Sequence, residues 1–128
     1  MSQPIVFISR WRVAAGRRDA WEQAYAAANA AVGAAKPRTA LFAAYLNAAG
    51  TETRILHAFP DAAAVEGHFE GSDERGSAVA DLIIPAGFEL YGPAPTSAVD
   101  QLRREAAASS VDLDLFPIAV AGYLRAPV

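Results

Sequence analysis

The stretch TRILHAFPDAAAVEGHF, residues 53–69, contains both histidines of the chain and the residue types of a strand, a turn and a helix. Its first seven residues predict a strand, which Pro60 ends. Asp61 then stands where a helix N-cap is expected, before apolar residues at helical spacing. Because a strand and the helix after it pack together, we expect His57 and His68 to open on one cavity.

Two further elements are expected on the N-terminal side. Residues 4–13, PIVFISRWRV, alternate between two faces and predict a strand that Gly16 ends. Residues 17–32 repeat apolar side chains at helical spacing and predict a helix that Gly33 and Pro37 stop.

A second strand is expected between this helix and the strand of His57, with a tight turn joining the two strands. Centring that turn near Ala49 puts Leu41 opposite His57 and Tyr45 opposite Thr53. The two strands would then form an antiparallel hairpin.

The C-terminal side adds four more elements. A helical piece is expected to begin at Ser72 and to end before Pro85. A strand candidate follows at residues 87–95, then an amphipathic helix at residues 97–108. Residues 111–125 predict a final extended segment, because apolar side chains alternate there with two aspartates.

The order of the first six elements is strand, helix, strand, strand, helix, strand, which is the split βαβ, ferredoxin-like arrangement. We therefore predict an α+β fold with an antiparallel sheet, helices on one face, and an additional C-terminal helix and strand. The chain of 128 residues is expected to be a single domain, with a core at residues 4–92 and a C-terminal extension at residues 93–128.

Composition narrows the classes of function. The net charge is −3 and there is no basic run, so nucleic acid is not an expected partner. The absence of cysteine excludes disulfides and thiolate chemistry. No apolar run reaches the ~20 residues of a membrane helix, and the N-terminal charges follow the apolar run, the reverse of a signal peptide. We expect a cytoplasmic protein that does not bind membranes.

Three segments resemble the antibiotic biosynthesis monooxygenase family of the dimeric α/β-barrel superfamily: ISRWRVAAGRRDAWEQAY at 8–25, TRILHAFPDAAAVEGHFEG at 53–71 and FELYG at 88–92. The resemblance implies a homodimer whose sheets pack face to face into a barrel. It also implies O₂-dependent oxidation of electron-rich phenols, hydroquinones or polyketide intermediates without metal or flavin. Other relatives of this kind degrade haem, act as isomerases or have no known reaction.

The haem-degrading branch of the family does not fit this sequence. That branch uses an asparagine on the first strand, a tryptophan at a strand end and a ligand histidine on the second helix. Ser9, Phe59 and Phe69 stand in the corresponding places, the last of them one residue past His68. We therefore do not expect haem degradation.

A cofactor-free oxygenase needs an apolar pocket, a base for a phenol and a donor for a developing oxyanion. Histidine has the fitting pKa, so His68 is the candidate base, assisted by His57 and by Tyr45 if Tyr45 points into the cavity. The candidate pocket residues are Phe7, Ser9, Trp11, Phe59 and Phe69. Each has a structural alternative: His57 as a core imidazole bonded to a carbonyl, His68 at a helix edge, and the aromatics as plain core.

The predicted function is a cofactor-independent monooxygenase acting on a small aromatic, quinol or polyketide-like substrate. The alternatives are a non-catalytic dimeric barrel that binds a small apolar ligand, and an isomerase or cyclase of the same fold. No metal or cofactor is expected, because ligand spacing and nucleotide-binding motifs are missing. From its length and alternation, the C-terminal extension is expected to add a strand that crosses to the other subunit.

Overall fold

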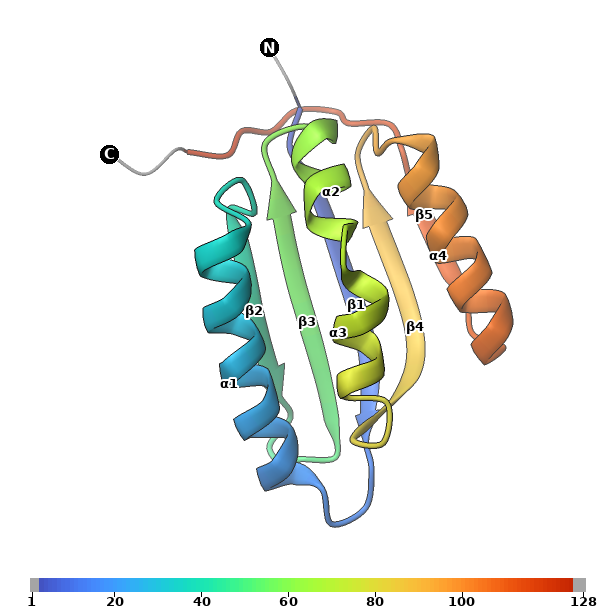
Figure 1. Ribbon diagram of the computed structural model, residues 1–128. Coiled ribbons are helices and arrows are strands. Elements are labelled where there is room, and N and C mark those ends of the chain that lie inside the picture. Colours follow the sequence, from blue (N-terminus) through green and yellow to red (C-terminus); the bar gives the residue numbers. More distant parts are fainter. Residues whose placement is uncertain (1–2, 126–128) are drawn as a thin grey trace.

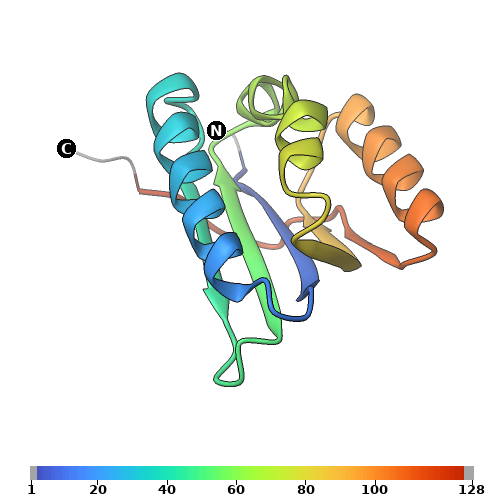
Figure 2. The same cartoon turned by 60° about the horizontal axis from the view of Figure 1, so that its bottom comes forward.

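The computed structural model describes residues 3–125, which form a five-stranded sheet with helices packed on one face (Figure 1). The strands are β1 (Ile5–Val13), β2 (Leu41–Leu46), β3 (Glu52–Phe59), β4 (Ile83–Tyr91) and β5 (Leu113–Phe116). The helices are α1 (Arg18–Ala35), α2 (Ala62–Phe69), α3 (Ser72–Ala78) and α4 (Thr96–Ser109). Figure 2 shows the helices as one layer above the sheet.

The strand order is β2-β3-β1-β4-β5, and all neighbours are antiparallel except β4 and β5, which are parallel. Parallel neighbours require a crossover, which α4 provides. The expected α+β, ferredoxin-like fold with an added C-terminal helix and strand is thus confirmed. Its second helix is divided into α2 and α3 at Gly71, whose φ of +78° lies in the left-handed region that favours glycine.

The core lies between the sheet and the helices. One buried cluster unites β1, β3 and β4 with α2 and α4, and includes Ile5, Phe59, Val65, Leu90 and Leu102. A second cluster lies beneath α1, where Trp21 packs with apolar residues of β3 and β4. Since α4 contributes to the first cluster, it helps to build the main core.

The hairpin register differs by one residue from the prediction. Phe42, not Leu41, lies opposite His57, and Tyr45 pairs with Arg54. The turn is longer than predicted because the Asn47 side chain accepts hydrogen bonds from two backbone N–H groups beyond it, those of residues 51 and 52. A shift of one residue turns every side chain of a strand to the opposite face. Tyr45 therefore lies on the sheet face away from the helices.

Two expected boundaries were also wrong. α1 continues through Gly33 to Ala35, so the stop lies nearer to Pro37. β4 begins at Ile83, four residues before the predicted strand, and it includes Pro85. The pairing of β1 with β4 shifts register next to this proline, because Arg10 pairs with Gly87 and Trp11 with Pro85, as expected of a bulge that accommodates proline in a sheet.

The sheet face away from the helices has no covering layer within residues 3–125 (Figures 1 and 2). Residues 117–125, here called the C-terminal arm, leave β5 and cross the end of the sheet toward the β2 side (Figure 1). Ile118 and Val120 in this arm are 83% and 99% exposed.

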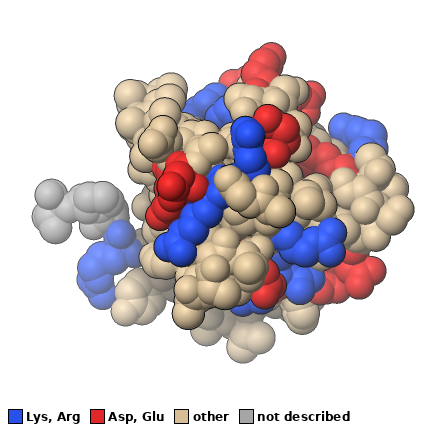
Figure 3. Space-filling view, turned by 90° about the horizontal axis from the view of Figure 1, so that it is seen from below, with Lys and Arg blue, Asp and Glu red and all other residues tan. Residues whose placement is uncertain are grey.

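In the view of Figure 3, basic and acidic side chains are interspersed. Within residues 3–125, no helix is long and apolar enough to cross a membrane.

Candidate active site

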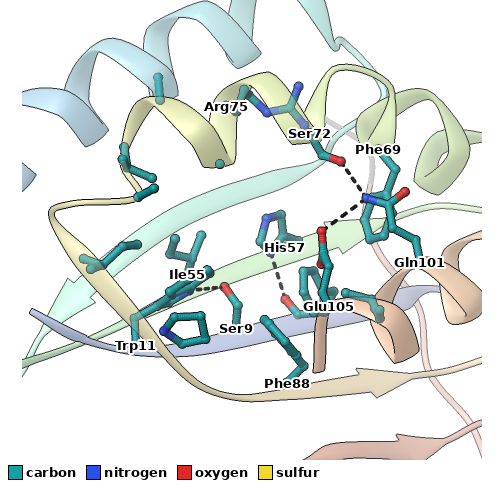
Figure 4. Close-up of a pocket in the computed structure, with 18 of the residues that line it drawn as sticks. Ser9, Trp11, Ile55, His57, Phe69, Ser72, Arg75, Phe88, Gln101 and Glu105 are labelled. Carbon is teal, nitrogen blue, oxygen red and sulfur yellow. Dashed lines mark hydrogen bonds between the residues drawn. The ribbon is translucent and has the colours of Figure 1, made fainter. Parts of the chain in front are cut away.

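A cavity of about 410 Å³ lies between the sheet and the helices (Figure 4). Its sheet wall includes Phe7, Ser9, Trp11, Ile55, His57 and Phe88. Its helix wall includes Tyr25 of α1, His68 and Phe69 of α2, Arg75 of α3, and Gln101 and Glu105 of α4. The volume is within the range of about 300–1,000 Å³ typical of small-molecule sites, and most of the lining is apolar with a few polar groups.

His57 lies in the sheet wall and is only 5% exposed. Its Nδ1 is 3.1 Å from the carbonyl oxygen of Phe7, and its ring stacks on the Phe7 ring at a centroid distance of 4.8 Å. A carbonyl only accepts, so Nδ1 donates and Nε2 keeps a free lone pair. Burial lowers the pKa of His57 to about 4. The hydrogen bond to the Phe7 carbonyl raises this pKa, but by less than burial lowers it.

His68 is positioned by α2, which begins as predicted with Asp61 accepting a hydrogen bond from the Ala64 N–H at 2.9 Å. The imidazole is 4% exposed, and its Nδ1 is 2.9 Å from Thr39 Oγ1. Burial first, and then the proximity of His57, Arg75 and Lys36, lowers its pKa to about 3. At neutral pH both imidazoles are therefore uncharged.

Arg75 supplies a positive charge to the helix wall of the cavity, and it is not among the site residues predicted from the sequence. Its guanidinium donates to the carbonyl oxygens of His68 at 2.5 Å and of Glu70 at 3.1 Å, at the C-terminal end of α2. Burial lowers the pKa of Arg75 from its usual value. No sequence motif marked this residue, because its place depends on how α3 folds back against α2.

A second polar group occupies the sheet wall away from the imidazoles. Trp11 Nε1 donates to Ser9 Oγ at 2.7 Å, and Ser9 is buried. The Trp11 ring meets Phe88 edge to face at 6.0 Å. Because the hydroxyl of Ser9 accepts this bond, its own proton remains available to a ligand.

A third polar group comes from α4, a helix that was not predicted to line the site. Gln101 Nε2 donates to Ser72 Oγ at 2.7 Å and lies 3.5 Å from Glu105 Oε1 (Figure 4). Gln101 and Glu105 are four residues apart, so they share one face of α4. Their spacing was visible in the sequence, but the surface against which that face packs was not.

The structure brings six of the eight predicted site residues to the cavity: Phe7, Ser9, Trp11, His57, His68 and Phe69. Phe59 is fully buried and does not line it, although its ring packs against the His68 ring at 5.3 Å. Tyr45 is 61% exposed on the opposite sheet face because of the register shift. The catalytic roles of the histidines remain predictions.

Metal ligation finds no support among residues 3–125, which contain no group of three His, Cys, Asp or Glu side chains placed to hold an ion. The two imidazoles are instead surrounded by the rings of Phe7, Phe42 and Phe59. This arrangement suits acid–base chemistry on an apolar ligand.

No protein-family model and no curated protein sequence matches the chain. Solved structures do match. MupZ from Pseudomonas fluorescens is 18% identical with a TM-score of 0.71, and the match covers 97% of this chain and 91% of MupZ. SnoaB from Streptomyces nogalater, a cofactor-independent oxygenase, is 17% identical with a TM-score of 0.58, covering 70% of this chain and 92% of SnoaB.

An antibiotic biosynthesis monooxygenase-like protein from Caulobacter crescentus is 15% identical with a TM-score of 0.61, covering 70% of this chain and 88% of that protein. The chain has the fold of antibiotic biosynthesis monooxygenase-like proteins. The family resemblance seen in the sequence is thus confirmed as a likeness of fold. Such a likeness does not transfer an activity, which has to be argued from the site itself.

Proposed function

We propose that the protein is a cofactor-independent monooxygenase that oxidises a small aromatic, quinol or polyketide-like substrate inside the cavity. The observation that carries the proposal is the pair of buried, uncharged imidazoles at the wall of an apolar cavity. An aromatic ring would pack against the phenylalanine rings of the walls, and a phenolic hydroxyl would meet the imidazoles.

His57 is the better-placed proton acceptor of the two. The bond from its Nδ1 to the Phe7 carbonyl fixes the tautomer, so Nε2 carries a lone pair. The sequence alone favoured His68 for this role. The Thr39 hydroxyl can instead donate to His68 Nδ1 and leave His68 Nε2–H as a donor toward the substrate oxygen.

A pKa near 4 makes His57 a weak base in the empty cavity. A phenolate formed beside it would favour the imidazolium and raise that pKa, because an opposite charge stabilises the protonated form. The positive charge of Arg75, on the helix wall of the same cavity, would stabilise the phenolate. Proton transfer and charge stabilisation therefore support each other once substrate is bound.

The proposed reaction needs only the substrate and O₂. The phenolate gives an electron to O₂, and the resulting radicals combine to form a carbon–oxygen bond in a hydroperoxide. Loss of water from the hydroperoxide then gives a quinone. In total, a phenol and O₂ yield a quinone and water. One oxygen atom of O₂ ends in the new carbonyl group of the quinone, and the other ends in the water molecule.

Oxygen uptake tests this proposal. The metal-free protein is given a panel of hydroquinones and phenolic polycycles in an oxygen electrode, beside His57→Gln and a sample without protein. We expect uptake well above autoxidation and a loss of about a hundredfold or more in His57→Gln. Uptake equal to the sample without protein for the whole panel would contradict the proposal.

Two other functions suit the same cavity. An isomerase or cyclase would use the imidazoles as acid and base, and would convert its substrate without consuming O₂. A ligand-binding protein would hold an apolar compound without converting it. Product analysis in the same assay separates these outcomes.

We further propose that a second copy of the chain covers the open face of the sheet, forming the homodimer that the resemblance implies. Tyr45 and Ile84 are exposed apolar side chains of β2 and β4, and Phe116 is exposed on β5. The exposed apolar side chains of the C-terminal arm would pack against the partner copy. A cytoplasmic location and the lack of a nucleic acid partner also remain predictions.

A further inference from the structure

A polar cluster in the helix wall of the cavity consists of Ser72 of α3 and of Gln101 and Glu105 of α4 (Figure 4). The amide nitrogen of Gln101 bridges the other two side chains, at 2.7 Å from Ser72 Oγ and 3.5 Å from Glu105 Oε1. Both contacts use the same nitrogen of the amide. They fix the amide with its nitrogen toward Glu105 and leave the carbonyl oxygen of Gln101 available.

The Glu105 carboxylate has capacity left to bind. Within residues 3–125, it forms no ion pair, and its contact with Gln101 is long for a hydrogen bond. Burial raises its pKa, Asp73 on α3 adds to that effect, and Gln101 and Arg104 oppose it. The partly buried carboxylate of Glu105 therefore keeps acceptor capacity for a ligand in the cavity.

On Gln101 and Glu105, every atom that remains free to bind a ligand is a hydrogen-bond acceptor. The carboxylate has only acceptor oxygens, and the Gln101 nitrogen is occupied by Ser72 and Glu105, which leaves its carbonyl oxygen. A ligand group that pairs with them must therefore donate a hydrogen bond. An ether, ketone or ester facing Gln101 and Glu105 would meet acceptors on both side chains and would leave the carboxylate unpaired, so its donor in this cluster would be the Ser72 hydroxyl, which keeps its own proton.

We propose that Gln101 and Glu105 recognise a second hydroxyl of the substrate, so that the cavity selects polyhydroxylated aromatic compounds over simple phenols. This inference rests on the proposed function, since it takes the cavity as the substrate site with one hydroxyl at the imidazoles. It assigns substrate selection to α4, a helix that follows the six-element ferredoxin-like core. The role of Glu105 is that of a binding residue.

Calorimetric binding without oxygen tests the inference independently of turnover. The probes are a naphthol, a naphthalenediol with its second hydroxyl on the other ring, and the methyl ether of that second hydroxyl. For the wild-type protein we expect the diol to bind about tenfold more tightly than either other probe, as a hydrogen bond to a charged group allows. Glu105→Leu should reduce this preference to less than about twofold.

Two further variants complete the experiment. Asp100→Leu changes an exposed acidic residue of α4 outside the cavity, and it should keep the full preference. Glu105→Gln retains one acceptor oxygen and should keep part of the preference for the diol. Equal affinity of the wild-type protein for diol and methyl ether would overturn the inference, as would full preference in Glu105→Leu or no binding of any probe.

The two proposals can fail separately. A preference for the diol that depends on Glu105, without any oxygen uptake, would keep the recognition site and contradict the monooxygenase. Oxygen uptake that depends on His57, with equal affinity for all three probes, would keep the monooxygenase and contradict the recognition site.

Discussion

The imidazoles of His57 and His68 meet edge to face with their centroids 5.0 Å apart, although one belongs to β3 and the other to α2. The pair is held from both sides, by the Phe7 carbonyl at His57 and by the Thr39 hydroxyl at His68. Two cations at this distance in a buried place would repel each other strongly, so the pair is stable only while uncharged.

The stability of the fold should therefore fall in acid. The unfolded chain binds protons on both histidines below a pH near 6.5, whereas the folded pKa values are about 4 and about 3. Stability is complete above pH 6.5 and is lost progressively as the pH falls from 6.5 toward 3. The loss is expected to be about 3 kcal/mol for His57 and about 5 kcal/mol for His68.

Urea unfolding at a series of pH values measures this effect. The double variant His57→Gln, His68→Gln contains no histidine, so its stability should change much less over the same range. A pH dependence equal to that of the wild-type protein would assign the acid sensitivity to the carboxylates instead.

Thr39→Val should act on His68 while preserving the shape of the site. The substitution removes the hydroxyl 2.9 Å from His68 Nδ1 and is expected to cost about 1 kcal/mol of stability. If this hydroxyl orients His68, turnover should fall at saturating substrate while KM changes little. Unfolding by urea serves as the control for stability. An unchanged kcat would show that His68 does not need the Thr39 hydroxyl to orient it.

Phe59 and Tyr45 were both predicted as site residues, and the structure assigns them to opposite environments. Phe59→Ala should destabilise the protein by about 3–5 kcal/mol, because it opens a void in the core. Tyr45→Ala should change the stability of an isolated subunit by less than about 0.5 kcal/mol. Equal effects of the two substitutions in urea unfolding would contradict the register of β2 against β3.

Removal of the C-terminal arm should weaken the proposed dimer. A chain ending at Phe116 keeps α4 and β5, whereas an end at Gly92 would also remove the buried residues of α4. We expect sedimentation equilibrium to give a dimer for the full chain and a dissociation constant at least about tenfold higher for the shortened chain. Unchanged dimerisation of the shortened chain would remove the arm from the interface.

The sequence predicted those parts of the site that depend on local pattern. Alternation in β1 placed Phe7, Ser9 and Trp11 on one face, and the Asp61 cap set the start of the helix that carries His68. The packing of a strand with its following helix then brought the two histidines to one cavity. These steps needed only spacing and capping, both of which are visible in a single sequence.

Other parts depended on geometry that the pattern does not contain. The side-chain hydrogen bonds of Asn47 lengthen the turn by one residue, and that shift turned Tyr45 to the other face. The amphipathic pattern of α4 predicted an inward face but not its partner, so Gln101 and Glu105 were not connected with the cavity. Arg75 was missed because the sequence pattern likewise does not show how α3 folds back against α2.

The most direct test of the monooxygenase is the origin of the oxygen atom in the product. The phenolic compound that the protein converts fastest is incubated under isotopically labelled O₂ in unlabelled water, and the product is analysed by mass spectrometry. We expect one labelled oxygen atom in each quinone formed, and little labelled product with His57→Gln. A product without label, or conversion that proceeds equally well without O₂, would contradict the proposed monooxygenase reaction.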